Sequence, residues 1–506
     1  MDDSNHEEPH LERPVTTTGR GDTDRVFRLE DSDLKDPITE QRLNAKKGLE
    51  FIPIQDEKSL PTELAGAAWN LCADCQLPVR CILFCNSLET AEETNKAIEK
   101  LAGEDKKKDQ AGTEVKTELF VGARRVFERE KVRKKLQEVG FIAKDDKRDD
   151  EEPKKKFFLI ATSAGEIGVD LDADHMVCDL VAWECMVQRL SRVNRRGEGD
   201  ARVLVIDPGP PKPKKAGKPT PGEEKTDQQH TVVRRLLDRL PRRDDDSLID
   251  VSPGALRSLK RRAEQESELQ ALIEDATTPE PLRPALSWPL MDAWSMTSLK
   301  EKEHTGWPEV GPWLRGWVDD DPQTAVVWRR YLPVRTKGIA VKDQEIKAFF
   351  EAAPLHTSEL LETEIYRVVD WLLARAKAIP EHKSDQFDGE SISAADDTPP
   401  SPTDEAETEQ SLRGTDMVAY ALSPANDLRQ QWTLEELRAT DTKAKQSLKE
   451  YLLRQLRGTT LIVDLRMGGL SDRGMLDPKK DDKRKERPRT ADADNDWSDM
   501  VRFRVR

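Results

Sequence analysis

The sequence has few cysteines, few aromatic residues and no long apolar run. Six cysteines occur among 506 residues, and aromatic residues make up 5%. Six thiols are too few for a disulfide framework, so we expect reduced cysteines. No apolar run approaches the roughly 18 residues of a membrane span, and none follows the acidic start MDDSNHEEPH. These absences predict a cytoplasmic protein with no membrane partner.

Charged residues, by contrast, are abundant. They make up 36% of the chain, against about 25% in an average globular protein, and the excess predicts loop-rich or unfolded segments. The net charge is −16, so the surface as a whole does not attract nucleic acid. Phosphate binding would therefore depend on local basic clusters.

Apolar strands alternate with amphipathic helices between residues 61 and 207. We expect strands at VRCILFC, TELFV, FFLIA, HMVCDL and ARVLVID. Continuous apolar strands separated by helices are typical of a parallel sheet with helices on both faces. The predicted fold class is therefore α/β, followed by mostly helical accessory regions and disordered linkers.

Composition divides the rest of the chain into further segments. A polar start is followed, after the sheet domain, by a Pro- and Lys-rich linker, a helical and tryptophan-rich accessory region, and an acidic disordered linker. A small helix-strand unit and a charged tail come last. We place these segments at 1–60, 208–225, 226–378, 379–415, 416–470 and 471–506.

Four cysteines near the first strand raise the question of a zinc site. Cys72 and Cys75 form a C-x-x-C pair, and Cys81 and Cys85 follow it. The last two lie inside an apolar run, where both would face one side of a strand. This favours core packing over zinc, and we predict no metal site.

The segment ATSAGEIGVDL follows the strand FFLIA, at the edge of an open parallel sheet where ligands bind. Small residues there let backbone amides approach a phosphate. Gly165 and Gly168 would supply that access, and Asp170 can accept hydrogen bonds from hydroxyl groups.

The segment WECMVQRLSRVNRRG is predicted to form a helix from about Glu184 to Asn194. Helical spacing places five polar residues in one sector and apolar residues on the opposite side. Because guanidinium groups repel one another and match phosphate geometry, this sector suits a triphosphate, the alternative being a solvated charged face. The polar residues are Gln188, Arg189, Arg192, Arg195 and Arg196.

Together these two segments resemble motifs V and VI of superfamily 2 helicases. The motif VI pattern Q/H-R-x-G-R-x-x-R is matched by QRLSRVNR, with Ser191 in the glycine position. The resemblance implies that the sheet is the second RecA-like domain of a helicase. It implies that Arg192 and Arg195 are catalytic arginine fingers on the γ-phosphate. It further implies ATP-binding roles for Gly168, Asp170, Gln188 and Arg189.

Two more segments resemble the motifs of that superfamily that contact nucleic acid. CILFCNSLETA is similar to motif IV, and ELFVGARRVFERE is similar to motif IVa. The resemblance implies that Asn86, Ser87, Gly122 and Arg124 lie near a single DNA strand. Thr162, in motif V, would touch the backbone of that strand.

The later part of the chain resembles the region after the helicase core in the CRISPR-associated helicase–nuclease of type I systems, in its I-U (or I-G) branch. The similar stretches include SWPLMDAWSMTSL, LETEIYRVVDWLLARA and VDLRMGGLSDRGMLD. In that family the complete enzyme is recruited by an RNA-guided surveillance complex, moves along the displaced DNA strand with ATP, and cuts it with an HD-type nuclease domain. The resemblance thus implies ATP, magnesium, single-stranded DNA and the surveillance complex as cofactors and partners.

The sequence has no P-loop of the form G-x-x-x-x-G-K-[ST], which would hold the nucleotide, and no His-Asp dipeptide of an HD nuclease. We therefore expect residues 1–60 to hold a remnant edge of the first RecA-like domain. ATP and magnesium would bind only with a separately encoded P-loop half, and the chain alone would be inactive. The alternative is a non-catalytic remnant that docks on DNA or on the surveillance complex.

Two further features are open to two interpretations. Six of the eleven tryptophans lie between residues 288 and 328. We expect them to anchor a small core rather than to stack on DNA bases. Basic residues after the first linker either contact phosphate or are scattered surface charge. These are Arg234, Arg235, Arg239, Arg242, Arg243, Lys260, Arg261 and Arg262.

Overall fold

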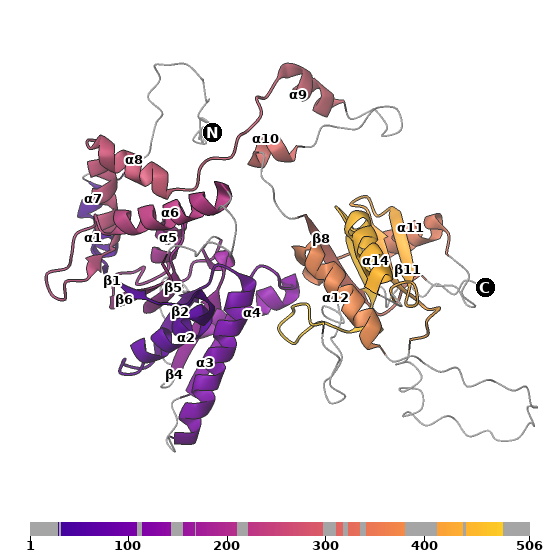
Figure 1. Ribbon diagram of the computed structural model, residues 1–506, viewed down its shortest axis with the longest axis horizontal. Coiled ribbons are helices and arrows are strands. Elements are labelled where there is room, and N and C mark those ends of the chain that lie inside the picture. The colour runs from indigo at the N-terminus through magenta and orange to yellow at the C-terminus, as the bar shows by residue number, and fades with distance from the viewer. Residues whose placement is uncertain are drawn as a thin grey trace, which may run out of the picture.

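A computed structural model shows two α/β domains, each built on its own sheet (Figure 1). The predicted linkers and the charged tail lie largely outside the described residues, as does most of the segment before residue 32. The structure describes residues 29, 32–108, 114–142, 155–166, 168–209, 221–296, 310–316, 322–333, 341–379, 412–438 and 442–478.

The first sheet has seven strands in the order β3-β4-β2-β5-β6-β1-β7. All paired strands are parallel except β7, which runs antiparallel to β1. The five strands predicted within 61–207 are confirmed as β2 to β6, and β1 and β7 extend the sheet beyond that range. The strands are β1 (Lys46–Pro53), β2 (Val79–Phe84), β3 (Glu114–Phe120), β4 (Lys155–Ala161), β5 (His175–Asp179), β6 (Asp200–Asp207) and β7 (Ile249–Asp250).

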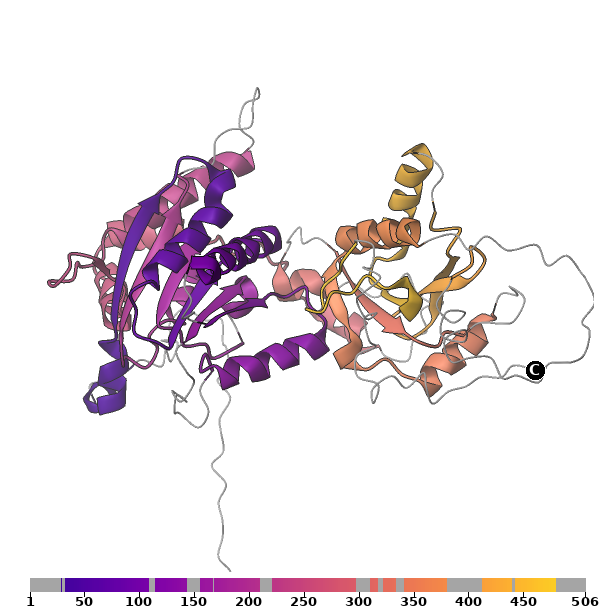
Figure 2. The ribbon, with the colours of Figure 1, turned by 90° about the horizontal axis from the view of Figure 1, so that it is seen from below.

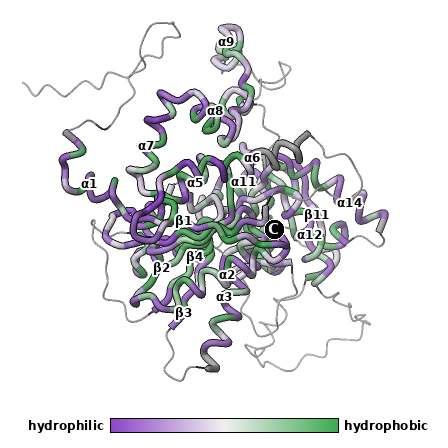
Figure 3. The backbone as a smooth tube through the Cα atoms, turned by 60° about the vertical axis from the view of Figure 1, so that its left-hand side comes forward, coloured by the Kyte–Doolittle hydropathy of each residue, from purple (hydrophilic) through white to green (hydrophobic). Residues whose placement is uncertain are grey.

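Helices cover both faces of this sheet, as predicted (Figure 2). Alternate residues of β2 pack on opposite sides: Cys81 and Leu83 face α2 and α3, whereas Ile82 and Phe84 face the cluster that includes α4 to α8. The strands accordingly carry mostly the hydrophobic colour in Figure 3. The helices are α1 (Pro37–Leu43), α2 (Leu60–Leu71), α3 (Leu88–Lys108), α4 (Val126–Glu138), α5 (Trp183–Leu190), α6 (Pro221–Leu237), α7 (Pro253–Ala263) and α8 (Ser267–Ala276).

The cysteines of β2 pack as expected. Cys81 and Cys85 are buried in the core under α2 and α3, which confirms the packing interpretation. Burial raises the pKa of Cys85 to about 12, so its thiol stays protonated at neutral pH.

The second sheet has five strands in the order β11-β10-β12-β8-β9. Its β12 and β8 are parallel neighbours, and this pairing joins the end of the accessory region 226–378 to the unit at 416–470. Helices α12 and α14 pack on one face, and α11 packs on the other. The elements are β8 (Gln323–Arg329), α11 (Asp343–Ala352), β9 (Leu361–Glu364), α12 (Ile365–Ala378), β10 (Met417–Leu422), β11 (Leu428–Thr433), α14 (Thr442–Gln455) and β12 (Thr460–Asp464).

Three predicted helices differ from the structure. The arginine-bearing helix α5 ends at Leu190, four residues early. The apolar spacing of residues 357–377 predicts one helix, but α12 starts only at Ile365, because Leu361–Glu364 pairs with β8 as a strand. The segment LEELRAT, expected to be helical, is a turn as far as it is described, and the Leu434 and Glu435 amides donate to the carbonyls of Asp416 and Gly414.

The tryptophans divide between core and surface. Trp328 is buried in the second domain, as expected of a core anchor. Trp288, in α9 (Trp288–Ser295), is 84% exposed, and Trp294 meets Trp313 of α10 (Gly311–Arg315) edge to face at 5.3 Å. Among the described helices, none has the length and apolar composition needed to cross a membrane.

Candidate functional site

A cavity of about 540 Å³ brings together residues of both segments that the sequence predicts to bind ATP. Asp170 comes from the glycine-containing segment, and Gln188, Arg192 and Arg195 come from the arginine segment. The lining also includes residues that sequence reasoning missed, namely Thr39, Arg42 and Lys47. Four basic side chains and one carboxylate thus border the cavity, which is the charge balance of a polyanion site.

The early end of α5 decides how the arginines point. After Leu190 the chain runs beside residues 170–174: the Ala173 amide donates to the Arg192 carbonyl at 2.9 Å, and the Asn194 amide donates to the Ala173 carbonyl at 2.8 Å. Arg192 and Arg195 are therefore carried by an irregular loop, not by a helix face. The prediction of one helical arginine sector was wrong.

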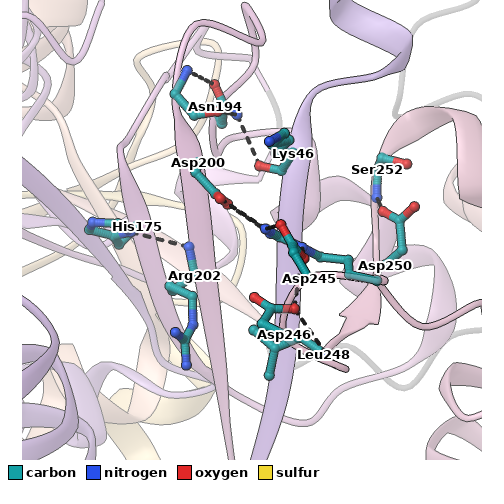
Figure 4. Close-up of polar contacts among 12 residues, drawn as sticks. Lys46, His175, Asn194, Asp200, Arg202, Asp245, Asp246, Leu248, Asp250 and Ser252 are labelled. Carbon is teal, nitrogen blue, oxygen red and sulfur yellow. Dashed lines mark hydrogen bonds and ion pairs between the residues drawn. The ribbon is translucent and has the colours of Figure 1, made fainter.

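Asn194 fixes this loop to the sheet. It has a positive φ of 39°, and its amide nitrogen Nδ2 donates to the carbonyls of Lys46 at 3.0 Å and Gly199 at 2.7 Å. Figure 4 shows its side chain directed at Lys46, the first residue of β1. The loop that carries Arg192 and Arg195 is thereby held against the strand that carries Lys47.

Arg195 and Asp170 form an accessible ion pair within the cavity. Arg195 Nη1 lies 2.7 Å from Asp170 Oδ1, and the two side chains are 41% and 72% exposed. Arg192 lies behind them, donating to the Glu166 carbonyl, with Nη1 3.7 Å from Asp170 Oδ1. An exposed ion pair contributes about 0 to 1 kcal/mol, so an incoming phosphate could replace Asp170 at small cost.

Arg189 is held in a different way. Its guanidinium donates to Glu166 Oε1 at 2.7 Å and to Asp179 Oδ1 at 2.6 Å, and all three side chains are buried. Burial opposes the charge, but the two carboxylates outweigh it and raise the pKa of Arg189. Arg189 does not line the cavity. The geometry makes it a structural tie between β5, the 163–166 turn and α5.

Lys47 points from β1 into the arginine cavity. Its ammonium donates to the Leu190 carbonyl at 2.9 Å. Burial lowers the pKa of Lys47 to about 8; Asp172 opposes this shift, and Arg195 adds to it. Because the positive charges of Arg195 and Lys47 repel each other, an anion in the cavity would reduce this repulsion.

The two glycines of the predicted phosphate loop differ in surroundings. Gly168 has a φ of +83° and open space where a side chain would project, and it lines a second cavity of about 270 Å³ with Asp170 and Arg192. A Cβ on Gly165 would lie 2.9 Å from Ala161 and 3.1 Å from Phe84. Gly165 therefore serves close packing on the sheet, whereas Gly168 leaves its backbone accessible.

The residues predicted to contact nucleic acid lie at the opposite edge of the sheet. Asn86, Gly122 and Thr162 follow the carboxyl ends of β2, β3 and β4, whereas Lys47 stands at the amino end of β1. Asn86 and Gly122 are exposed and Thr162 is half-buried. The structure thus places Asn86, Gly122 and Thr162 at the opposite ends of the strands from the arginine cavity.

Two of the predicted strand-contact residues are engaged locally. The Ser87 hydroxyl accepts the Thr90 amide at 3.0 Å at the start of α3. Arg124 is buried, and its guanidinium lies 3.3 Å from Glu118. Burial lowers the pKa of Arg124 despite that carboxylate. Arg124 therefore stabilises the conformation of the Gly122–Arg125 turn through its contact with Glu118.

Several basic residues after the linker have acidic partners in the structure. Arg243 contacts Asp200 at 2.7 Å and Asp245 at 2.9 Å, and Figure 4 shows these aspartates gathered beside β6. Arg234 contacts Asp207, and Arg262 contacts Glu266. These pairs favour the surface-charge interpretation for the three arginines.

Sequence reasoning missed the residues before the predicted domain. Lys47 alternates with Leu49 and Phe51 on the face of β1 that packs on the main core. An ammonium group at such a position requires a polar partner. A lysine in the place of an apolar residue in this alternation could therefore have identified Lys47 as a candidate site residue.

The cavity fits a polyphosphate but not a resident metal. Arg42, Lys47, Arg192 and Arg195 can donate to phosphate oxygens. Within the described residues, no group of three or more histidine, cysteine, aspartate or glutamate side chains is arranged to hold a metal ion.

A family comparison bears directly on this domain. Residues 79–198 match the family model described as "CRISPR-associated nuclease/helicase Cas3, C-terminal". This part of the chain is therefore similar to the C-terminal domain of Cas3-type nuclease/helicases, as the motifs predict. No curated protein sequence matches the chain.

The chain is also similar to several solved structures. It aligns with T. fusca Cas3 bound to ATP at 12% identity and a TM-score of 0.36, over 64% of this chain and 36% of that one. It aligns with a chain of a CRISPR RNA-guided surveillance complex in its pre-nicking state at 13% identity and a TM-score of 0.31, over 64% of this chain and 38% of that one. It aligns with the E. coli DExH-box NTPase HrpB at 12% identity and a TM-score of 0.22, over 43% of this chain and 26% of that one. The chain thus spans little more than a third of those Cas3 chains.

Proposed function

We propose that the seven-stranded domain is the second RecA-like half of an ATP-dependent DNA helicase of type I CRISPR interference, of the I-U branch, and works with a P-loop half. The observation that carries the proposal is the shared cavity of Asp170, Gln188, Arg192 and Arg195. The Cas3-type family match over residues 79–198 supports it. Without a P-loop the chain alone turns over no ATP.

Each residue of the cavity then has a distinct task. Arg195, which is more accessible than Arg192, leaves Asp170 and donates to the terminal phosphate; Arg192, already oriented by the Glu166 carbonyl, donates beside it. Gln188 and the open backbone of Gly168 offer neutral contacts, and Asp170 is freed to accept from a hydroxyl. ATP supplies the free energy of phosphoryl transfer, and its magnesium is held by the P-loop half.

The opposite edge of the sheet would contact single-stranded DNA. Asn86, Gly122 and Thr162 offer an exposed amide, an open backbone turn and a hydroxyl group at three neighbouring strand ends. In this proposal the displaced DNA strand and the surveillance complex are the partners of the chain. The two buried arginines have positioning roles. Arg189 supports the arginine cavity, and Arg124 supports the turn at the DNA-facing edge.

The first test is nucleotide binding by the whole chain combined with a helicase half that carries a P-loop. We expect ATP to bind more tightly than AMP, because the cavity recognises phosphate charge, and the difference should shrink as salt increases. Arg192→Ala combined with Arg195→Ala should weaken ATP binding about tenfold or more, on the scale of two charge-assisted hydrogen bonds. Isothermal titration calorimetry measures both.

Arg196 provides a matched control for this test. It adjoins Arg195 but lies 3.8 Å from Asp172 and does not line the cavity, so Arg196→Ala should leave ATP affinity unchanged. Equal affinity for ATP and AMP in the native chain would contradict the proposal and favour the non-catalytic docking alternative.

A second prediction concerns pH. Because the pKa of Lys47 is about 8, its ammonium is present below that pH and is lost above it. We expect pyrophosphate affinity to fall as the pH rises from 7 to 9, and Lys47→Met to flatten that profile. Titration at constant ionic strength measures the effect; a native profile as flat as that of the variant would contradict it.

The same group has an opposite effect on stability. The ordinary pKa of a lysine is 10.5, so between about pH 8 and 10.5 the unfolded chain binds a proton that the folded chain lacks. Folding stability should therefore rise with pH in that window through Lys47. Anion affinity and stability thus change in opposite directions, which separates loss of the binding charge from loss of the fold.

A further inference from the structure

The five-stranded domain sends one loop onto the helicase domain. Residues 468–477 leave the end of β12 and return on themselves, with an antiparallel bridge between Leu470 and Leu476 and a hydrogen bond from the Asp477 amide to the Gly469 carbonyl. In Figures 1 and 2 this loop extends from the second sheet to α4. We call residues 468–477 the docking arm.

The base of the docking arm is rigid. Three buried side chains donate to consecutive carbonyls: Arg375 to Met467 at 2.7 and 2.9 Å, Trp328 to Gly468 at 2.9 Å, and Trp371 to Gly469 at 2.8 Å. A Cβ on Gly469 would lie 2.6 Å from Trp371 Nε1. The arm is thus fixed to its own domain by donors that have no competing water.

The tip of the docking arm is fixed to the helicase domain. The Arg125 amide donates to the Gly474 carbonyl at 2.7 Å, and Arg473 contacts Glu99 of α3 at 2.6 Å. Met475 is buried in the core under α2 and α3. Backbone, charge and apolar contacts therefore act at three successive residues.

Contacts from the second domain complete the start of α4, and the tip of the docking arm supplies the one at the N-cap residue Arg125. This helix has no side-chain cap, and amides in the first turn of a helix lack partners within the helix. Two carbonyls of the second domain satisfy them, since the Val126 amide donates to Leu360 at 3.0 Å beside the Arg125–Gly474 bond. The same turn is tied to α4 by Arg129, which donates to the Gly122 carbonyl at 2.7 Å.

We propose that the docking arm makes the five-stranded domain a positioning element for the strand-contact turn Gly122–Arg125, by capping α4. The link to DNA rests on the proposed function, whereas the capping itself does not. A displacement of the second domain relative to the first then changes the turn that faces the DNA strand. The partner of this surface is the chain's own accessory domain.

The test replaces Gly474 by valine in the whole chain. Gly474 has a φ of +73°, and a Cβ there would lie 2.7 Å from Glu128, so the tip must withdraw. We expect the amide of Arg125, which loses its partner Gly474, to exchange with solvent about tenfold faster, as expected when a helix cap is lost. Hydrogen exchange read by mass spectrometry over residues 122–130 measures this.

Two further variants make the result specific. Arg473→Ala removes only the contact with Glu99 and should give a smaller increase in the same peptide. Asp472→Ala, at an exposed position of the same arm, should give none. Unchanged exchange in Gly474→Val, or an equal increase throughout β5 and α5, would overturn the proposal, because the first shows no cap and the second shows global unfolding.

Binding of a fluorescent single-stranded oligonucleotide separates the two proposals. Faster exchange with weaker DNA binding in Gly474→Val, and neither in Asp472→Ala, supports the arm as a positioning element for DNA. If Gly474→Val speeds exchange but the native chain binds no oligonucleotide, the docking arm still caps α4. In that case the proposed DNA contact at this edge is rejected. Faster exchange with unchanged DNA binding overturns the positioning role.

Discussion

Replacing Arg189 by alanine is expected to destabilise the seven-stranded domain by about 3 to 5 kcal/mol. The change would leave Asp179 and Glu166 buried without their counter-charge, and removing one partner of a buried ion pair has this order of cost. For a domain of this size the melting temperature should fall by about 10 °C. Differential scanning calorimetry measures the transition.

The matched comparison is Arg195→Ala. Its side chain is 41% exposed and pairs with a carboxylate that is 72% exposed, so its removal should change stability by about 1 kcal/mol or less. Removing all three charges at once, with Arg189→Met, Glu166→Gln and Asp179→Asn, should recover much of the loss, because no buried charge is left unpaired. A melting temperature within about 2 °C of the native value for Arg189→Ala would contradict the structural role.

The sheet of the helicase domain was predictable because its strands are apolar on both faces. The residues of β2 and β4 are almost all buried, and such runs leave little choice but a covered parallel sheet. β1 was placed outside the domain because Lys46, Lys47 and Glu50 interrupt its apolar pattern. Its membership depends on pairing with β6, about 150 residues away, and a local pattern does not record such pairing.

Four members of the arginine cavity, Asp170, Gln188, Arg192 and Arg195, were predictable, but its geometry was not. Extrapolating the helical period past Leu190 placed Arg189 and Arg192 side by side. The carbonyls and amides of Ala173, Arg192 and Asn194 instead pair between two segments of the chain, and this contact ends the helix. Arg189 consequently turns to the buried carboxylates, while Arg192 and Arg195 reach the cavity.

The second domain illustrates the same limit. Its strands β8 and β12 were each readable as apolar runs, yet the residues between them include the segment 379–415, whose composition suggested a domain boundary. The parallel pairing of Val326 with Leu461 and of Trp328 with Val463 joins the two parts. Composition identifies linkers, but it does not show whether the chain returns to the same sheet.

Combined with a helicase half that carries a P-loop, the Arg195→Ala chain is expected to lose about a thousandfold in kcat. Arginine fingers stabilise the charge that develops on the transferred phosphoryl group, and their removal has effects of this size. KM for ATP should change far less, because the interaction strengthens in the transition state. Steady-state ATP hydrolysis with single-stranded DNA present measures both constants.

Arg195→Lys and Arg196→Ala distinguish a finger from general positive charge. Lysine retains the charge but lacks the planar fork that donates to two phosphate oxygens, so most of the loss in kcat should persist. Arg196→Ala should keep native turnover, since Arg196 lies outside the cavity lining. If lysine restored full turnover, or if Arg196→Ala lowered kcat as far as Arg195→Ala, the charge of the loop rather than the geometry of Arg195 would act on the nucleotide.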